Sequence, residues 1–332
     1  MNGKARIQSI LNGERCDVPP LMPIVHTALA RVQAVPLGRY FTDACVMADV
    51  IMSGYREFGF DGVQLTMGVA GEAEALGADV EQPPDGAPLV KSHPLRDPAC
   101  LDRLRECDVA GGGRMPLYHE AVARVVEQIG NEVFVLSTLR GPLNIASQLR
   151  GVEDVLIDMI DDPEGVERIL DFTTDVAIQC SRASLAAGAH GLMFGEATCS
   201  PNFISPAMYR QIVHPRHVRL VAELRRMGVQ CVGLHVCGNI LPILDDLIAT
   251  GADLLDVDYQ VPASQALERA AGRVTLRGNL DPVGDLFKAT PESVREKTRS
   301  LVGQTAGQRW ILSSGCDIPP GTSRENLAAL RP

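Results

Sequence analysis

The sequence predicts one α/β domain in which eight parallel strands alternate with helices and close into a (β/α)8 barrel. Three observations lead to this fold class. Eight short runs are almost continuously apolar, as strands buried on both faces should be. Helical patterns separate most of these runs. The chain of 332 residues, 45% hydrophobic, is also a common size for a single barrel of this type.

The apolar runs occur in a regular rhythm and predict the strands at residues 21–26, 62–67, 133–138, 191–195, 229–236, 253–257, 273–278 and 310–314. The helical patterns between them cover residues 44–58, 117–129, 152–187, 205–227, 241–250, 262–271 and 291–303. We therefore expect a TIM barrel spanning residues 1–332, with residues 1–20 as an N-terminal cap.

The stretch from about residue 68 to residue 116 interrupts this rhythm between the second and third runs. It contains several turn-forming residues, among them Pro83, Pro84, Gly86 and Pro88. We interpret it as an insertion that carries turns, with room for a short hairpin, before the next helix.

Charge and cysteine content exclude several classes of protein. The formal net charge of −10 disfavours nucleic acid as a partner, because phosphate binding needs a positive surface. No run approaches the roughly 20 apolar residues of a membrane span, and the N-terminus does not resemble a signal peptide. Nine scattered cysteines do not form a disulfide framework. We expect a cytoplasmic protein in which clustered cysteines act as ligands or nucleophiles.

The strongest chemical signal is the pair His235 and Cys237 at the end of the fifth run. Residues i and i+2 of a strand point to the same side, so imidazole and thiol are presented together. Cys316 follows the eighth run and lies at the same barrel end, where active sites of this fold are found. Two cysteines and one histidine with an open fourth position suit a catalytic zinc. Alternatively, all three residues are packed core side chains.

Other polar residues follow strand ends at the same mouth. Glu196 could complete the metal shell, orient His235 as an outer partner, or act as a catalytic acid or base. Asn279 and Asp281 follow the seventh run and suit substrate binding, although Asp281 could equally cap the helix that begins at Pro282. His26 ends the first run and could bind substrate or lie in a solvated loop.

Several segments resemble the uroporphyrinogen decarboxylase superfamily, and more closely its zinc-dependent, corrinoid-linked methyltransferases. The similar segments follow the third run, begin the helix after the fourth run, follow the seventh run and end the chain: Gly141-Pro142-Leu143, Ile204-Ser205-Pro206, Gly278-Asn279-Leu280-Asp281-Pro282 and Ser314-Gly315-Cys316-Asp317-Ile318-Pro319-Pro320-Gly321. The decarboxylase branch carries an "RQAGRY" segment and an aspartate after an early strand. Here only Gly38-Arg39-Tyr40 remains of that segment, and no aspartate ends the second run.

The resemblance implies a zinc ion held by His235, Cys237 and Cys316. It also implies methyl transfer between a corrinoid (methylcobamide), carried by a partner protein, and a small molecule, for which we expect a thiol. In a donor-side alternative, a methylated small molecule gives its methyl group to cob(I)amide. A decarboxylase-like lyase and a non-catalytic zinc scaffold are further alternatives. The sequence does not determine the oligomeric state, and a homodimer is one of the possible states.

Overall fold

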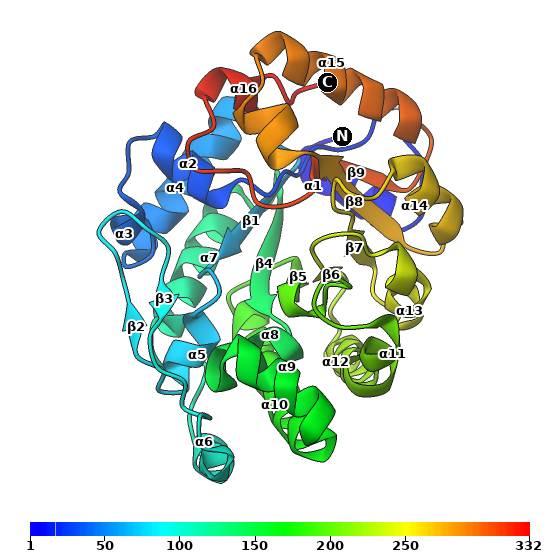
Figure 1. Cartoon of the computed structure of the whole chain (residues 1–332). Helices are drawn as coiled ribbons and strands as arrows, with labels where there is room; N and C mark the ends of the chain where they lie inside the picture. The colour runs from blue at the N-terminus through cyan, green and yellow to red at the C-terminus, as the bar shows by residue number, and fades with distance from the viewer. Residues whose placement is uncertain (17) are drawn as a thin grey trace.

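The computed structural model describes residues 1–16 and 18–332, and within them a curled parallel sheet forms the centre of the molecule (Figure 1). The expected α/β barrel class is confirmed. The strand order in this part of the chain is β1-β4-β5-β6-β7-β8-β9. The strands are β1 (Gly62–Thr66), β4 (Phe134–Arg140), β5 (Gly191–Gly195), β6 (Val232–His235), β7 (Leu254–Asp256), β8 (Thr275–Leu280) and β9 (Trp310–Ser314).

The first apolar run, predicted as a strand at residues 21–26, does not form one. Leu21 makes a single parallel bridge with Leu312 of β9, and its carbonyl oxygen accepts the N–H of Asp61 beside β1 at 2.8 Å. Pro20 and Pro23 lack the N–H groups that a longer ladder needs. The run therefore links the two edge strands of the sheet through one residue, instead of adding an eighth strand.

Helices cover the outside of the sheet and follow the expected rhythm. The long helical pattern at 152–187 is broken, because Asp162 caps a new helix that has Pro163 as its first residue. The covering helices are α2 (His26–Val32), α3 (Leu37–Tyr40), α4 (Ala44–Phe58), α7 (Met115–Ile129), α8 (Pro142–Arg150), α9 (Val152–Asp161), α10 (Pro163–Ala186), α11 (Pro206–Met208), η3 (Tyr209–Val213), α12 (His214–Arg226), η4 (Leu241–Ile243), α13 (Leu244–Ala249), α14 (Ala263–Ala270), η5 (Pro282–Phe287), α15 (Pro291–Thr305) and α16 (Arg324–Ala328).

The amino ends of the strands are covered by α1 (Gly3–Leu11). Ile7 and Ile10 of this helix are fully buried against inward side chains of the sheet, namely Phe134, Leu136, Met193, Cys231, Leu254 and Ile311. This apolar layer fills the lower part of the barrel interior. The carboxyl ends of the strands are the end left for a functional site.

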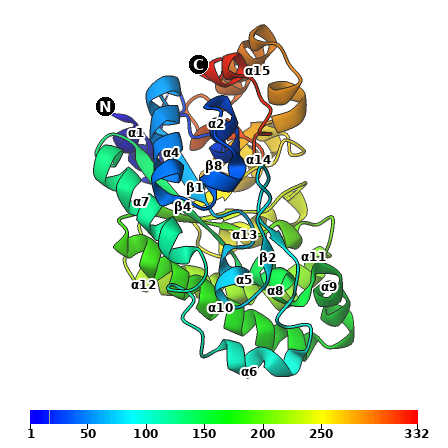
Figure 2. The same cartoon turned by 90° about the vertical axis from the view of Figure 1, so that its left-hand side faces the viewer.

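Residues 68–116 contain α5 (Gly71–Ala75), an antiparallel hairpin of β2 (Val80–Glu81) and β3 (Leu89–Val90), η1 (Pro98–Cys100) and α6 (Leu101–Leu104). This segment, cyan in Figure 1, faces the viewer in Figure 2. Among the described residues, no helix combines the length and apolar character that crossing a membrane requires.

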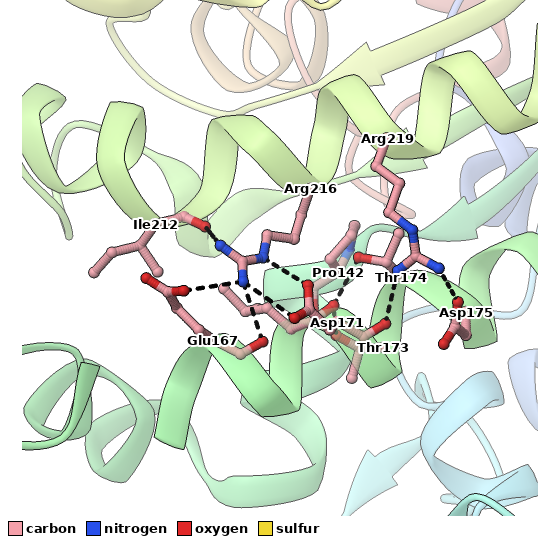
Figure 3. Close-up of polar contacts among 10 residues, drawn as sticks. Pro142, Glu167, Asp171, Thr173, Thr174, Asp175, Ile212, Arg216 and Arg219 are labelled. Carbon is pink, nitrogen blue, oxygen red and sulfur yellow. Dashed lines mark hydrogen bonds and ion pairs between the residues drawn. The ribbon is translucent and has the colours of Figure 1, made fainter. Parts of the chain in front are cut away.

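A row of ion pairs joins α10 to α12 on the outside of the molecule (Figure 3). Arg216 donates to Asp171 at 2.9 Å and to Glu167 at 3.2 Å, and Arg219 pairs with Asp175 one turn further along. These ion pairs, called here the α10–α12 seam, fix the outer face of α12 against α10. His217, which follows Arg216, lies on the inner face of α12 and is completely buried.

Candidate metal centre and substrate cavity

A cavity of about 220 Å³ opens at the carboxyl ends of the strands. Its walls come from segments far apart in the chain, including β1, β4, β6 and the residues just after β9. Its floor and sides include apolar groups such as Ile24, Val69 and Met193. Catalytic residues of parallel α/β barrels lie at this end, so the cavity is the candidate active site.

The structure brings His235, Cys237 and Cys316 together in the wall of this cavity. The Nε2 atom of His235 lies 3.2 Å from the Cys237 sulfur and 3.8 Å from the Cys316 sulfur, and the two sulfurs are 3.8 Å apart. Tetrahedral zinc with Zn–S bonds of about 2.3 Å separates two thiolates by about 3.8 Å. The three side chains therefore fit a tetrahedral metal ion that keeps its fourth position open to the cavity.

A buried ion pair orients the imidazole from below. His235 Nδ1 donates to Asp256 at 2.8 Å, which leaves Nε2 to face the sulfurs. The same carboxylate accepts two hydrogen bonds from Arg277 at 2.6 and 2.7 Å, and Arg277 also donates to Gln64 at 2.7 Å. A carboxylate behind a histidine ligand fixes the tautomer and ring orientation that metal binding needs.

The close contact of these groups shifts their pKa values in opposite directions. Burial would lower the pKa of His235, but the Cys237 sulfur and the Asp256 carboxylate together raise it well above 6.5. A hydrogen bond from Cys237, supported by the imidazole, lowers the pKa of Cys316 to about 4. These shifts favour an imidazolium next to a Cys316 thiolate when no metal is bound. A metal ion binding there would displace the remaining protons, because its ligands must be deprotonated.

His26 lines the same cavity and is only 5% exposed. It is the first residue of α2, and its Nδ1 atom lies 3.4 Å from the Asp317 carboxylate. Burial, together with the positive charges of Arg140 and Arg277, lowers the pKa of His26 to about 3, so the ring is neutral at pH 7.

Glu196 requires a correction, because its side chain does not reach the cavity. It directly follows β5, but its carboxylate turns behind the strand and is completely buried. There it accepts the N–H groups of Leu143 and Asn144 at 3.1 and 2.8 Å and contacts His217 Nε2 at 2.8 Å. Gly141 leaves the space that this carboxylate occupies. The geometry gives Glu196 the role of anchoring the start of α8, which carries Asn144 into the cavity wall.

Asn279 and Asp281 also lie away from the cavity. The Asn279 amide donates to the carbonyl oxygens of Asp258 and Val261 at 3.3 and 2.6 Å. The Asp281 carboxylate accepts the N–H of Val283 at 2.9 Å, which caps the helical turn η5. In the structure Asp281 therefore caps this turn, which is the alternative role that the sequence offered for it.

Arg140, Thr138 and Asn144 also line the cavity, although no sequence pattern indicated them. Arg140 is the last residue of β4 and shares the inward-facing side of that strand with Thr138. Thr138 and Arg140 lie two residues apart at the carboxyl end of a strand, and this spacing could have indicated that both face the cavity.

Comparison with known proteins identifies the family. The family model for uroporphyrinogen decarboxylase (URO-D) matches residues 2–331. The chain belongs to the uroporphyrinogen decarboxylase family.

A methylcobamide:CoM methyltransferase, MtbA, from Methanosarcina acetivorans is 27% identical over 98% of this chain and 95% of its own length. A methylated-thiol–coenzyme M methyltransferase from Methanosarcina mazei is 26% identical over 97% of this chain and 86% of its own. A solved methyltransferase structure from Methanosarcina mazei superposes with a TM-score of 0.91 at 26% identity, covering 99% of this chain and 97% of that one. Uroporphyrinogen decarboxylases also match, over a smaller share of the chain. The resemblance to the methyltransferase branch is thus confirmed, and the chain is an enzyme of the methyltransferase type.

Proposed function

We propose that this enzyme moves a methyl group between a corrinoid, carried by a partner protein, and a small-molecule thiol, with zinc bound by His235, Cys237 and Cys316. The observation that carries the proposal is the placement of one imidazole nitrogen and two sulfurs within 3.8 Å of one another at the cavity. The printed names of the similar methyltransferases, which include a methylcobamide and coenzyme M, support the corrinoid and the thiol.

The residues around the triad have separable tasks. Zinc, when bound, would keep an incoming thiol in its nucleophilic thiolate form. Asp256 holds the His235 ring with Nε2 toward the sulfurs, and the neutral His26 adds no positive charge that would oppose a cation. Apolar side chains such as Ile24 and Met193 limit water in the cavity, which strengthens electrostatic interactions there.

Methyl transfer can be tested without oxygen by mixing the enzyme with methylcobalamin and a thiol, and by following the absorbance of released cob(I)alamin. We expect turnover by the zinc-loaded enzyme and none by Cys316→Ser. If the zinc-loaded enzyme demethylates methylcobalamin with none of a panel of neutral, anionic and cationic thiols, the proposal is wrong for the acceptor direction.

The donor-side reaction is the second candidate, because one relative is named for a methylated thiol. Here cob(I)alamin would accept a methyl group from a methylthio compound, and formation of methylcobalamin would be the readout. A decarboxylase-like reaction is less well supported. Of the described residues that line the cavity, only Arg140 is an arginine or lysine, whereas a porphyrinogen carries several carboxylates.

A further inference from the structure

Arg277 is a fully buried cation inside the barrel, behind the candidate metal centre. It lies on β8 beside its pairing partner Asp256 on β7, and its side chain is 0% exposed. Its Nε and Nη2 atoms donate to the two carboxylate oxygens of Asp256 at 2.7 and 2.6 Å, and its Nη1 donates to Gln64 Oε1 at 2.7 Å. The guanidinium is therefore held on two sides, and it does not line the cavity.

One carboxylate oxygen connects this cation to the metal centre. Asp256 Oδ2 accepts hydrogen bonds both from Arg277 Nη2 at 2.6 Å and from His235 Nδ1 at 2.8 Å. Arg277 therefore shares the negative charge that Asp256 would otherwise direct entirely at the ring. Because a guanidinium is not deprotonated in a protein, this positive charge is constant.

The buried Glu196–His217 pair shows that a carboxylate can support a histidine without a cation. Glu196 contacts His217 Nε2 at 2.8 Å and accepts hydrogen bonds from two neutral backbone N–H groups at the start of α8. Among the described residues, no arginine or lysine pairs with it. Burying a guanidinium is costly unless its charge is compensated. The charge of Arg277 therefore needs a reason beyond the hydrogen bonds of Asp256.

A count of formal charges at the metal-loaded centre gives that reason. A neutral His235 ring, the Asp256 carboxylate and the Arg277 guanidinium together carry no net charge. The thiolates of Cys237 and Cys316 balance a divalent cation, so the centre and its support are neutral before a fourth ligand binds. Without Arg277 the same centre would carry one negative charge, which would repel an incoming thiolate in a site shielded from water.

We propose that Arg277 is a positioning residue that sets the charge of the metal centre, so that an anionic ligand such as a thiolate can occupy the open fourth position. It acts through Asp256 and His235 and contacts no substrate. This proposal rests on the metal binding by His235, Cys237 and Cys316 that the proposed function also requires. It concerns ligand binding and not methyl transfer, so the two proposals can fail separately.

Cobalt(II) in place of zinc makes ligand binding measurable, because a ligand at the open position changes the visible absorption of the ion. Mercaptoethanol, which binds metal as a thiolate, and imidazole, which binds as a neutral ligand, are titrated separately into the cobalt-saturated enzyme at one pH without oxygen. The dissociation constant of imidazole divided by that of the thiol is the anion preference of the centre. General damage to the site weakens both ligands and leaves this preference unchanged.

Variants that change the charge should change the anion preference in opposite directions. It should fall by at least about tenfold in Arg277→Gln and rise by a similar factor in Asp256→Asn, because each removes one charge of opposite sign. The double variant Asp256→Asn/Arg277→Gln loses both charges and should return to within about threefold of the wild type. Arg277→Lys keeps the charge and should also remain within about threefold. Arg216→Gln, in the α10–α12 seam, is the control and should leave the preference unchanged.

An equal anion preference in the wild type, Arg277→Gln and Asp256→Asn would overturn the proposal, as would a double variant that keeps the preference of either single variant. A wild-type cobalt enzyme that binds neither ligand would also overturn it, because no open position would exist. If Arg277→Gln does not fold, the rise in Asp256→Asn and its reversal in the double variant test the same charge. Absence of methyl transfer alongside the expected preferences would overturn only the proposed function.

Discussion

Two clusters in this molecule contain the same kinds of side chain but have different surroundings. His235, Cys237 and Cys316 line the cavity, whereas Glu196, Cys199 and His217 are completely buried behind β5. In each cluster the potential ligand atoms lie within 4.8 Å of one another. Residue type and proximity alone would make both clusters metal sites.

Hydrogen bonding distinguishes them. The Glu196 carboxylate accepts two backbone N–H groups and contacts His217 Nε2, while the other ring nitrogen of His217 contacts the Tyr209 hydroxyl at 3.0 Å. Every strong donor and acceptor there has a protein partner. In the first cluster the two sulfurs lie within 3.8 Å of each other and of the His235 ring, and they line the open cavity. We interpret the open cluster as the metal site and the closed one as a structural anchor. Five variants test this comparison.

The largest effect should come from matched cysteine replacements. Cys316→Ser removes one of three ligands and should reduce bound zinc from about one ion per chain to nearly none. The enzyme with Cys199→Ser, a change in the closed cluster, should still bind about one zinc ion per chain. Elemental analysis after gel filtration gives both values. Zinc lost from Cys199→Ser but kept by Cys316→Ser would reverse the assignment of the two clusters.

Glu196→Gln should act on stability instead of metal content. It removes a buried charge that holds the start of α8 and His217, and breaking a buried pair of this kind costs about 3 kcal/mol or more. Urea denaturation should show the loss, while zinc content per folded chain stays unchanged. Normal stability with reduced zinc would mean that Glu196 belongs to the metal centre.

Asp256→Asn should weaken the metal centre without removing a ligand. Loss of a carboxylate behind a histidine ligand typically lowers metal affinity 10- to 100-fold. Competition with a chromophoric chelator measures this change. Because Arg277 would lose its charged partner, the denaturation midpoint serves as the control for misfolding. Unchanged zinc affinity in a folded variant would contradict the orienting role of Asp256.

Arg216→Ala should have the smallest effect. Its pairs with Asp171 and Glu167 lie in the partly exposed α10–α12 seam of Figure 3, where an ion pair contributes about 1 kcal/mol or less. The unfolding free energy should fall by about that amount, with zinc content intact. A loss comparable to that of Glu196→Gln would mean that the seam, and not the buried cluster, positions α12.

Apolar runs and strand parity predicted the regular parts of the molecule well. The bounds of β5 and β9 coincide with the predicted runs 191–195 and 310–314, since both are short apolar stretches between turn residues. Parity likewise indicated that His235 and Cys237 face the same side. The run at 21–26 does not form a strand, because Pro23 within it and Pro20 just before it lack the N–H groups that a ladder needs.

Side chains at the ends of strands were harder to place. Glu196 follows β5 directly, but its backbone leaves the strand conformation (φ −134°, ψ 51°), so strand parity no longer applies to it. The sequence does not indicate Arg140, because the predicted apolar run ends at Thr138, whereas β4 continues for two more residues. Both positions depend on glycines of neighbouring segments, Gly141 and Gly195, whose role appears only when the chain is folded.

Zinc K-edge X-ray absorption of the purified enzyme tests the central claim most directly. Ligation by His235, Cys237 and Cys316 predicts two sulfur scatterers at about 2.3 Å and one or two nitrogen or oxygen scatterers at about 2.0–2.1 Å. It also predicts a third sulfur when a thiol is added. A zinc shell containing only nitrogen and oxygen, or a folded enzyme that does not retain zinc, would contradict the account.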